Sequence, residues 1–154
     1  MQLSSLKDTE NLSKKLTKII KSGDIIFLYG EIGTGKTTFS QGFALGMNID
    51  ESVISPTFKL VSEYYGDRTL NHIDCYRLES SSDFLKIGGE NFINCKDGVT
   101  LIEWADRIKE PLGLLSLLAR DENPRVRMEA VLAAGQIPQM ESIQVVAMAS
   151  EREM

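Results

Sequence analysis

The chain has 154 residues, a net charge of −5 at pH 7 and 42% hydrophobic residues, an ordinary composition for a globular protein. Its length suits one domain, or one small domain with a piece of another. The negative net charge argues against nucleic-acid binding through bulk charge. No apolar run is long enough to span a bilayer and the N-terminus has no apolar signal core, so we expect a cytoplasmic protein with no membrane segment.

Up to residue 109, helical and strand-like patterns alternate along the chain. A first helix, capped at Asp8 or Thr9, is predicted to end at Ser22-Gly23. After it we predict strands over residues 24–29, 58–65, 70–75 and 99–103, a helix over 37–47, and a short helix from a cap at 80–83 to residue 87. Strands that alternate with helices predict an α/β fold with a parallel core and helices on the faces of the sheet.

The loop after the first predicted strand reads G-E-I-G-T-G-K-T and fits G-x-x-x-x-G-K-[ST], the phosphate-binding P-loop. Its glycines let backbone N–H groups turn toward an anion, and the following helix presents its positive end to the same anion. In this arrangement Lys36 would reach the β- and γ-phosphates and the Thr37 hydroxyl would hold Mg²⁺. The expected fold class is therefore a P-loop NTPase-type α/β sheet. The candidate nucleotide-binding residues are Gly30, Glu31, Ile32, Gly33, Thr34, Gly35, Lys36, Thr37 and Thr38.

Two acidic residues end predicted strands: Asp74 closes the run L-N-H-I-D, and Glu103 closes V-T-L-I-E. In open α/β sheets the ligand binds at the carboxyl ends of the strands. An acid there can hold Mg²⁺ directly or through water, or orient an attacking water. We therefore assign Lys36, Asp74 and Glu103 as candidate catalytic residues, and Thr37, Glu103 and Asp74 as candidate metal ligands. Which of the two acids binds the metal directly stays open.

Two further residues are candidates for switching or partner contact. Thr57, in the run I-S-P-T-F, has the position of a switch loop whose hydroxyl senses the γ-phosphate. An ordinary proline-containing turn is the alternative for that run. Trp104 directly follows the second acidic strand end, and it is either a partner anchor or part of the core.

The composition of the chain changes near residue 110. All ten lysines lie at or before Lys109 and all eleven aromatic residues at or before Trp104, whereas six of the eight alanines lie after residue 110. We interpret residues 1–109 as a P-loop domain and residues 110–154 as a second segment. In that segment we predict helices over 112–120, from 124 to 135 and over 142–148, in a pattern that resembles a HEAT-like helical repeat.

One partial repeat cannot bury its own apolar face, so such a tail must dock on something or stay loose. Three origins of the junction are open: a natural fusion, a gene-prediction or assembly artefact, and a designed chimera. The small size of the partial repeat favours an unnatural or misassembled junction. A P-loop sheet that ends at residue 109 would lack its last strands and expose an edge, which predicts reduced stability.

The series G-E-I-G-T-G-K-T-T, S-P-T-F, H-I-D-C-Y-R-L and I-E-W-A-D-R, in this order and spacing, resembles the TsaE family over residues 2–109. That family consists of bacterial ATPases required for threonylcarbamoyladenosine modification of tRNA. The resemblance implies that the chain binds ATP and Mg²⁺ and hydrolyses ATP slowly. It also implies that a complex of two partner proteins, which makes the modified nucleoside, switches this activity on, and that tRNA is engaged only indirectly.

The resemblance to this family also implies roles for the residues at matching positions of this chain. It implies that Lys36 and Thr37 bind phosphate and Mg²⁺, and that Asp74 and Glu103 are the essential acids. It places Thr57 in the switch-like loop and makes Trp104 functionally important. In this family, hydrolysis would reset the partner transferase complex between turnovers.

Two functions of other classes remain open. One is a nucleotide-dependent interaction module with little hydrolysis, whose helical tail docks a partner. The other is a small-molecule or nucleoside kinase, although no arginine-rich lid segment follows the core. The lack of a guanine-reading N-K-x-D run favours ATP over GTP.

Overall fold

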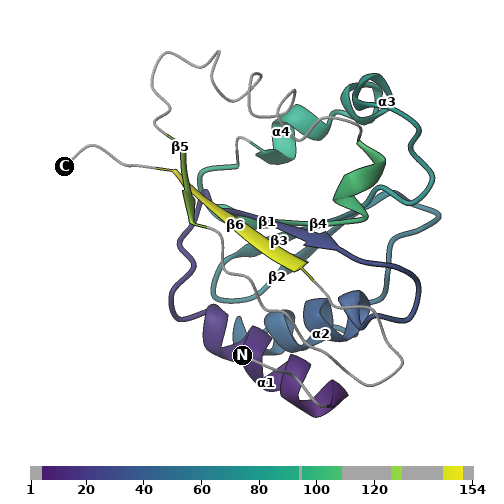
Figure 1. The fold of residues 1–154 in the computed structure, drawn as a ribbon. Coiled ribbons are helices and arrows are strands. Elements are labelled where there is room, and N and C mark those ends of the chain that lie inside the picture. Colours follow the sequence, from purple (N-terminus) through teal and green to yellow (C-terminus); the bar gives the residue numbers. More distant parts are fainter. Residues whose placement is uncertain (1–4, 94, 109–125, 130–143, 151–154) are drawn as a thin grey trace.

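The computed structural model describes residues 5–93, 95–108, 126–129 and 144–150. In these residues six strands form one sheet, in the order β2-β3-β4-β1-β6-β5 (Figure 1). Strands β3, β4 and β1 run parallel to one another, whereas β2, β6 and β5 each pair antiparallel with their neighbours. The strands are β1 Ile25–Tyr29, β2 Val61–Tyr65, β3 Thr69–Asp74, β4 Gly98–Glu103, β5 Val126–Glu129 and β6 Gln144–Ser150.

Helices cover both faces of the sheet. One face carries the first two helices and the other carries the shorter ones, as Figure 1 shows. The helices are α1 Leu6–Leu16, α2 Lys36–Gly46, α3 Ser81–Lys86, α4 Gly89–Ile93 and the 3₁₀ helix η1 Ala105–Arg107. None of the helices that the structure describes combines the length and apolar character needed to cross a membrane. The predicted α/β fold with a parallel core and flanking helices is confirmed.

The core has two parts, one on each side of the sheet. Ile26 and Leu28 of β1 join the cluster that contains Phe39 and Phe43 of α2. Their neighbours Ile25 and Phe27 join the opposite cluster, with Phe84 of α3 and Trp104. Successive side chains of a strand point to opposite faces, so a strand covered on both faces must be apolar throughout. This is why β1 reads I-I-F-L-Y without polar alternation.

Of the two N-caps that the sequence predicted, the cap of α3 is confirmed and the cap of α1 is wrong. Ser80 caps α3 as expected, because its side chain accepts a hydrogen bond from the Asp83 N–H at 3.2 Å. The cap predicted for the first helix is wrong: Ser5 caps α1 and accepts from the Asp8 N–H at 3.2 Å. Asp8 instead lies in the first turn, where its carboxylate accepts a hydrogen bond from the Ser5 hydroxyl and faces the positive helix end.

The prediction of a helical tail after residue 110 is wrong for the part of that tail that the structure describes. Residues 126–129 and 144–150 form β5 and β6, and the HEAT-like repeat is not supported. Strand β6 pairs with β1 from Ile25–Met148 to Tyr29–Gln144. This pairing satisfies backbone groups of β1 that would otherwise lie unpaired at a sheet edge, and it outweighs the helix preference of the alanines. The sheet therefore continues past β1, whereas a sheet lacking its last strands was expected. The predicted helix over 112–120 lies outside the described residues.

Helices α1 and α2 pack closely through a glycine. A Cβ atom added at Gly42 would lie 2.8 Å from the Glu10 Cα and would also overlap the Ser13 hydroxyl. Backbone atoms of α1 cannot move aside without displacing the whole helix. Gly42 therefore fixes the distance between α1 and the helix that follows the P-loop.

We expect Gly42→Ala to destabilise the fold by about 2 kcal/mol, because overpacking against backbone outweighs the gain in helix propensity. In thermal unfolding followed by circular dichroism, this corresponds to a fall in Tm of about 4–8 °C. Leu45→Ala is the matched control, since Leu45 lies on the same helix and is 52% exposed. An unchanged or raised Tm for the Gly42 variant would contradict the packing argument.

Candidate functional site

The P-loop connects the carboxyl end of β1 to the amino end of α2. Gly33 and Gly35 have φ angles of 83° and 96°, in the left-handed region that other residues rarely adopt. Gly35 is the N-cap of α2, so the helix starts at Lys36 with its first N–H groups directed at the loop. The glycines of the motif are thus required by the backbone path as well as by close approach of an anion.

Lys36 is held at the floor of this loop. Its ammonium Nζ donates hydrogen bonds to the carbonyl oxygens of Gly30 at 2.6 Å and Glu31 at 2.7 Å. Nζ also lies 3.8 Å from the centroid of the Trp104 ring, in a cation–π contact. Burial lowers the pKa of Lys36, and the nearby carboxylates of Glu103 and Asp106 oppose that shift. The loop therefore keeps a positive charge in place through its own carbonyl groups and one aromatic face.

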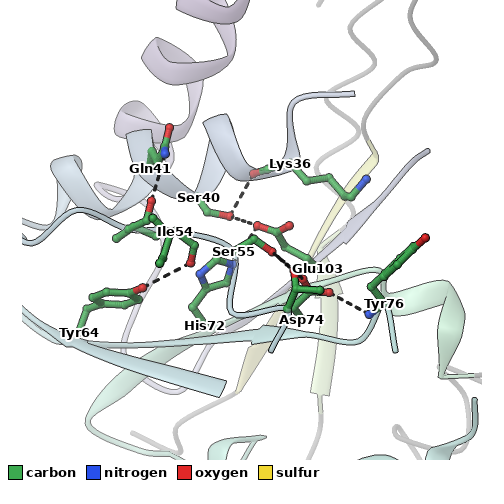
Figure 2. A network of polar contacts seen from close by, with 12 residues as sticks. Lys36, Ser40, Gln41, Ile54, Ser55, Tyr64, His72, Asp74, Tyr76 and Glu103 are labelled. Atoms are coloured by element: carbon green, nitrogen blue, oxygen red, sulfur yellow. Dashed lines mark hydrogen bonds and ion pairs between the residues drawn. The ribbon is translucent and has the colours of Figure 1, made fainter. Parts of the chain in front are cut away.

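The Glu103 carboxylate lies beneath α2, at the end of β4. Its Oε1 accepts a hydrogen bond from the Ser40 hydroxyl at 2.7 Å and lies 2.9 Å from His72 Nε2 (Figure 2). Glu103 and His72 are 1% and 0% exposed. In the described residues, no hydrogen bond involves the second carboxylate oxygen, Oε2. One oxygen of Glu103 is thus fixed by the protein, and the other has capacity for a ligand.

Asp74, at the end of β3, connects the sheet to the switch-like loop, residues 54–58. Its Oδ2 accepts hydrogen bonds from the Ser55 hydroxyl at 2.5 Å and the Thr57 hydroxyl at 2.7 Å. Its Oδ1 accepts from the Tyr76 backbone N–H at 2.8 Å. Asp74 and Glu103 are paired in the register of β3 and β4, so the two acids lie side by side. The position of the switch-like loop therefore depends on a carboxylate next to the P-loop.

A pocket of about 480 Å³ opens between the P-loop, the two acidic strand ends and the switch-like loop. Gly30, Glu31 and Thr34 do not line it, although all three contact the Lys36 ammonium. The other predicted site residues converge on it. The lining residues are Leu6, Ile32, Gly33, Gly35, Lys36, Thr37, Thr38, Ser55, Thr57, Asp74, Tyr76, Glu103 and Trp104.

Trp104 forms part of an aromatic wall. Its ring centroid lies 4.9 Å from that of Tyr76, and it is only 8% exposed. Its backbone is left-handed, with φ of 56°, because the chain turns there from β4 into η1. Arg107 lies over both rings, with its guanidinium carbon 5.2 Å from the Tyr76 centroid. Trp104 belongs both to the core beneath η1 and to the wall of the pocket.

Four polar or aromatic residues of the site, Ser40, Ser55, His72 and Tyr76, were missed when the sequence was considered alone, as was the apolar Leu6 that lines the pocket. Signals for two of them exist. Ser40 lies one helical turn after Lys36, and His72 lies two residues before Asp74, so each shares a face with a predicted site residue. Ser55 and Tyr76 lie within the quoted runs S-P-T-F and H-I-D-C-Y-R-L, but their hydrogen bonds to Asp74 depend on proximity in the fold, which the spacing does not give. Across the described ranges, no three His, Cys, Asp or Glu side chains gather as a metal-binding group.

Comparison with known proteins gives the family. The family model described as "Threonylcarbamoyl adenosine biosynthesis protein TsaE" matches residues 3–130, well past the residue 109 at which we placed the end of the resemblance. The relatives of this chain include three proteins named tRNA threonylcarbamoyladenosine biosynthesis protein TsaE. The one from Treponema pallidum (strain Nichols) is 39% identical over 108 residues, which is 70% of this chain and 79% of the relative.

The relative from Bacillus subtilis (strain 168) is 41% identical over 107 residues, covering 69% of this chain and 66% of the relative. The relative from Aquifex aeolicus (strain VF5) is 36% identical over 126 residues, covering 80% and 89%. The P-loop, the acidic strand ends and the switch-like loop all lie within the residues that the family model matches. This chain therefore belongs to the TsaE family.

Proposed function

We propose that this chain is an ATP-binding, Mg²⁺-dependent ATPase subunit that supports threonylcarbamoyladenosine modification of tRNA in the cytoplasm. It acts on a complex of two partner proteins and resets that complex between turnovers. The carrying observation is the convergence of Lys36, Asp74 and Glu103 on one pocket at the carboxyl ends of parallel strands. The family names support the connection to threonylcarbamoyladenosine biosynthesis.

In this proposal the P-loop binds the phosphates of ATP through its backbone N–H groups and the amino end of α2. Lys36 exchanges its hydrogen bonds to the Gly30 and Glu31 carbonyls for phosphate oxygens, because a charged acceptor binds an ammonium more strongly. Trp104 stays in contact with the lysine and limits where its charge can move. The positive charge is therefore supplied from within the loop at the point where negative charge develops.

The donor set in the pocket fits Mg²⁺. Thr37, Asp74 and Glu103 offer only oxygen atoms, which this ion prefers, and such sites in ATPases use one or two carboxylates together with phosphate oxygens. Bound there, Mg²⁺ would neutralise charge on the phosphates. Both oxygens of Asp74 already accept hydrogen bonds, whereas Oε2 of Glu103 accepts none within the described part of the chain. We therefore assign direct contact with the ion or the attacking water to Glu103, and a contact through water to Asp74.

Asp74 has a second role in this proposal. Its carboxylate holds the hydroxyls of Ser55 and Thr57, which line the same pocket. A γ-phosphate and its ion would compete for those hydroxyls, so the position of the switch-like loop would report whether ATP or ADP is bound. We expect the partner complex to sense the nucleotide through this loop, and Trp104, which is 8% exposed, to act from the pocket wall.

Phosphate release by the full chain, with and without the two partner proteins, tests the proposal. We expect slow release from Mg²⁺-ATP by the chain alone and a clear increase when the partners are added. Intact ATP binding with no increase would instead favour a nucleotide-dependent interaction module. Transfer of the γ-phosphate to an acceptor other than water would indicate a kinase and overturn the proposal.

A further inference from the structure

The buried contact between His72 and Glu103 is the feature that the proposed roles leave unused. We propose that His72 is a positioning residue for ATP hydrolysis: it holds one oxygen of Glu103 so that the other faces the ligand pocket. This inference rests on the proposed function, because Glu103 must act on the ion or the attacking water. His72 itself does not line the pocket.

The geometry restricts Glu103 to few orientations. His72 Nε2 lies 2.9 Å from Glu103 Oε1, and the two side chains are 0% and 2% exposed. His72 and Glu103 lie on adjacent strands, on the face of the sheet that α2 covers. The Ser40 hydroxyl, which Figure 2 shows at the Glu103 carboxylate, contacts the same oxygen as the imidazole. Because two hydrogen bonds hold one oxygen of this carboxylate, its other oxygen points in a fixed direction.

The unpaired second ring nitrogen, Nδ1, helps to explain why this position carries a histidine. An ionised carboxylate only accepts hydrogen bonds, so Nε2 must carry a proton to bond to Glu103 Oε1. Nδ1 is buried and has no hydrogen-bond partner among the described residues. A buried unpaired nitrogen reduces stability, and an apolar side chain would avoid that loss. The donor at Nε2 is the function that explains a histidine at this position.

Ser40 is a weaker constraint than His72. Its hydroxyl carries one proton but lies within reach of two acceptors, Glu103 Oε1 at 2.7 Å and the Lys36 carbonyl at 3.0 Å. It can therefore turn away from Glu103 and still be satisfied. Within the described residues, Nε2 of His72 has only Glu103 as an acceptor. The orientation of the carboxylate thus depends mainly on the imidazole.

A pair of substitutions separates positioning from packing. A glutamine amide can take the place of Nε2, whereas an asparagine amide reaches only the place of Nδ1. We expect His72→Asn to lower kcat for partner-stimulated ATP hydrolysis by about ten- to a hundredfold, since small misplacement of a reacting group has effects of this size. The Kd for ATP should change less than about threefold, because the P-loop is untouched. His72→Gln should recover most of the lost kcat.

A merely structural role would lower Tm in both variants and leave kcat of the folded fraction unchanged. That result, or equal loss of kcat in both variants, would overturn the proposal. The two variants are compared at a temperature well below both unfolding transitions, with the folded fraction measured by circular dichroism.

A second measurement does not depend on hydrolysis. His72 is the only histidine of the chain, so ¹⁵N-histidine labelling of the untagged protein gives signals from one imidazole alone. We expect a protonated Nε2 and a shift of the Nε2–H signal in Glu103→Gln. An Nε2 that carries no proton would overturn the inference even in an active enzyme. If the parent chain hydrolyses no ATP, the proposed function fails, and these spectra still decide whether His72 holds Glu103.

Discussion

Replacing Lys36 with alanine is expected to weaken ATP binding by about a hundredfold and to remove measurable hydrolysis. The ammonium is buried and already in contact with two carbonyl groups of the loop, so it is in place before ATP arrives. Hydrogen bonds to charged groups contribute about 1.5–3 kcal/mol, and about 2.7 kcal/mol corresponds to a hundredfold in affinity. Isothermal titration with ATP gives the affinity, and phosphate release gives the turnover.

Two control variants show whether charge or structure is responsible. Lys36→Met keeps an unbranched stem against the Trp104 ring but has no charge, so it should lose ATP binding as strongly as the alanine variant does. Lys18→Ala removes the same charge from an exposed position outside the pocket and should bind ATP as the parent does. If Lys36→Ala and the parent bind ATP equally well, the site assignment is wrong.

The sequence was a good guide where contacts are local. The P-loop closes on itself within a few residues: Lys36 reaches the carbonyls of Gly30 and Glu31, so one motif contains both the charge and the groups that hold it. The two acids were predictable for a similar reason. Each ends a strand, and neighbouring parallel strands bring their carboxyl ends to one edge of the sheet.

Contacts that depend on the register between strands could not be predicted from the sequence. The pairing of Asp74 with Glu103 fixes which residues of β3 face the neighbouring acid, and only then does His72 become its hydrogen-bond partner. Ser55 reaches Asp74 across 19 residues of chain, through a loop whose path no local pattern specifies. Register and loop path are set by burial of a whole face, which single-sequence patterns do not resolve.

The tail shows how tertiary pairing can override local preference. Its alanines and methionines favour helix, and this led to the helical prediction. In the fold, β1 needs a partner on the side away from β4, and residues 144–150 provide one. The segment contains Val145-Val146, and β-branched residues suit a strand. A segment that joins an existing sheet gains backbone hydrogen bonds to its neighbouring strand, and its own sequence pattern does not predict these bonds.

The prediction with the largest effect on folding follows from this pairing. A chain ending at Lys109 loses β6 and β5, so β1 becomes an edge strand with unpaired backbone groups along one side. We expect this chain to lack a cooperative thermal unfolding transition and to aggregate, because an exposed apolar strand such as I-I-F-L-Y pairs with other molecules. ATP binding should be lost as well, since the P-loop starts directly at the end of β1.

A chain ending at Ser150 is the matched control, because it removes only residues 151–154 and keeps both described strands. It should unfold at the Tm of the full chain and bind ATP equally well. The comparison also decides the predicted boundary between residues 1–109 and 110–154. If the chain ending at Lys109 unfolds cooperatively at the parent Tm and binds ATP, residues 1–109 are a domain on their own, and β6 adds nothing that β1 requires. If this chain fails to unfold cooperatively or to bind ATP, the residues after 109 are needed to complete the sheet whose strand β1 leads into the P-loop.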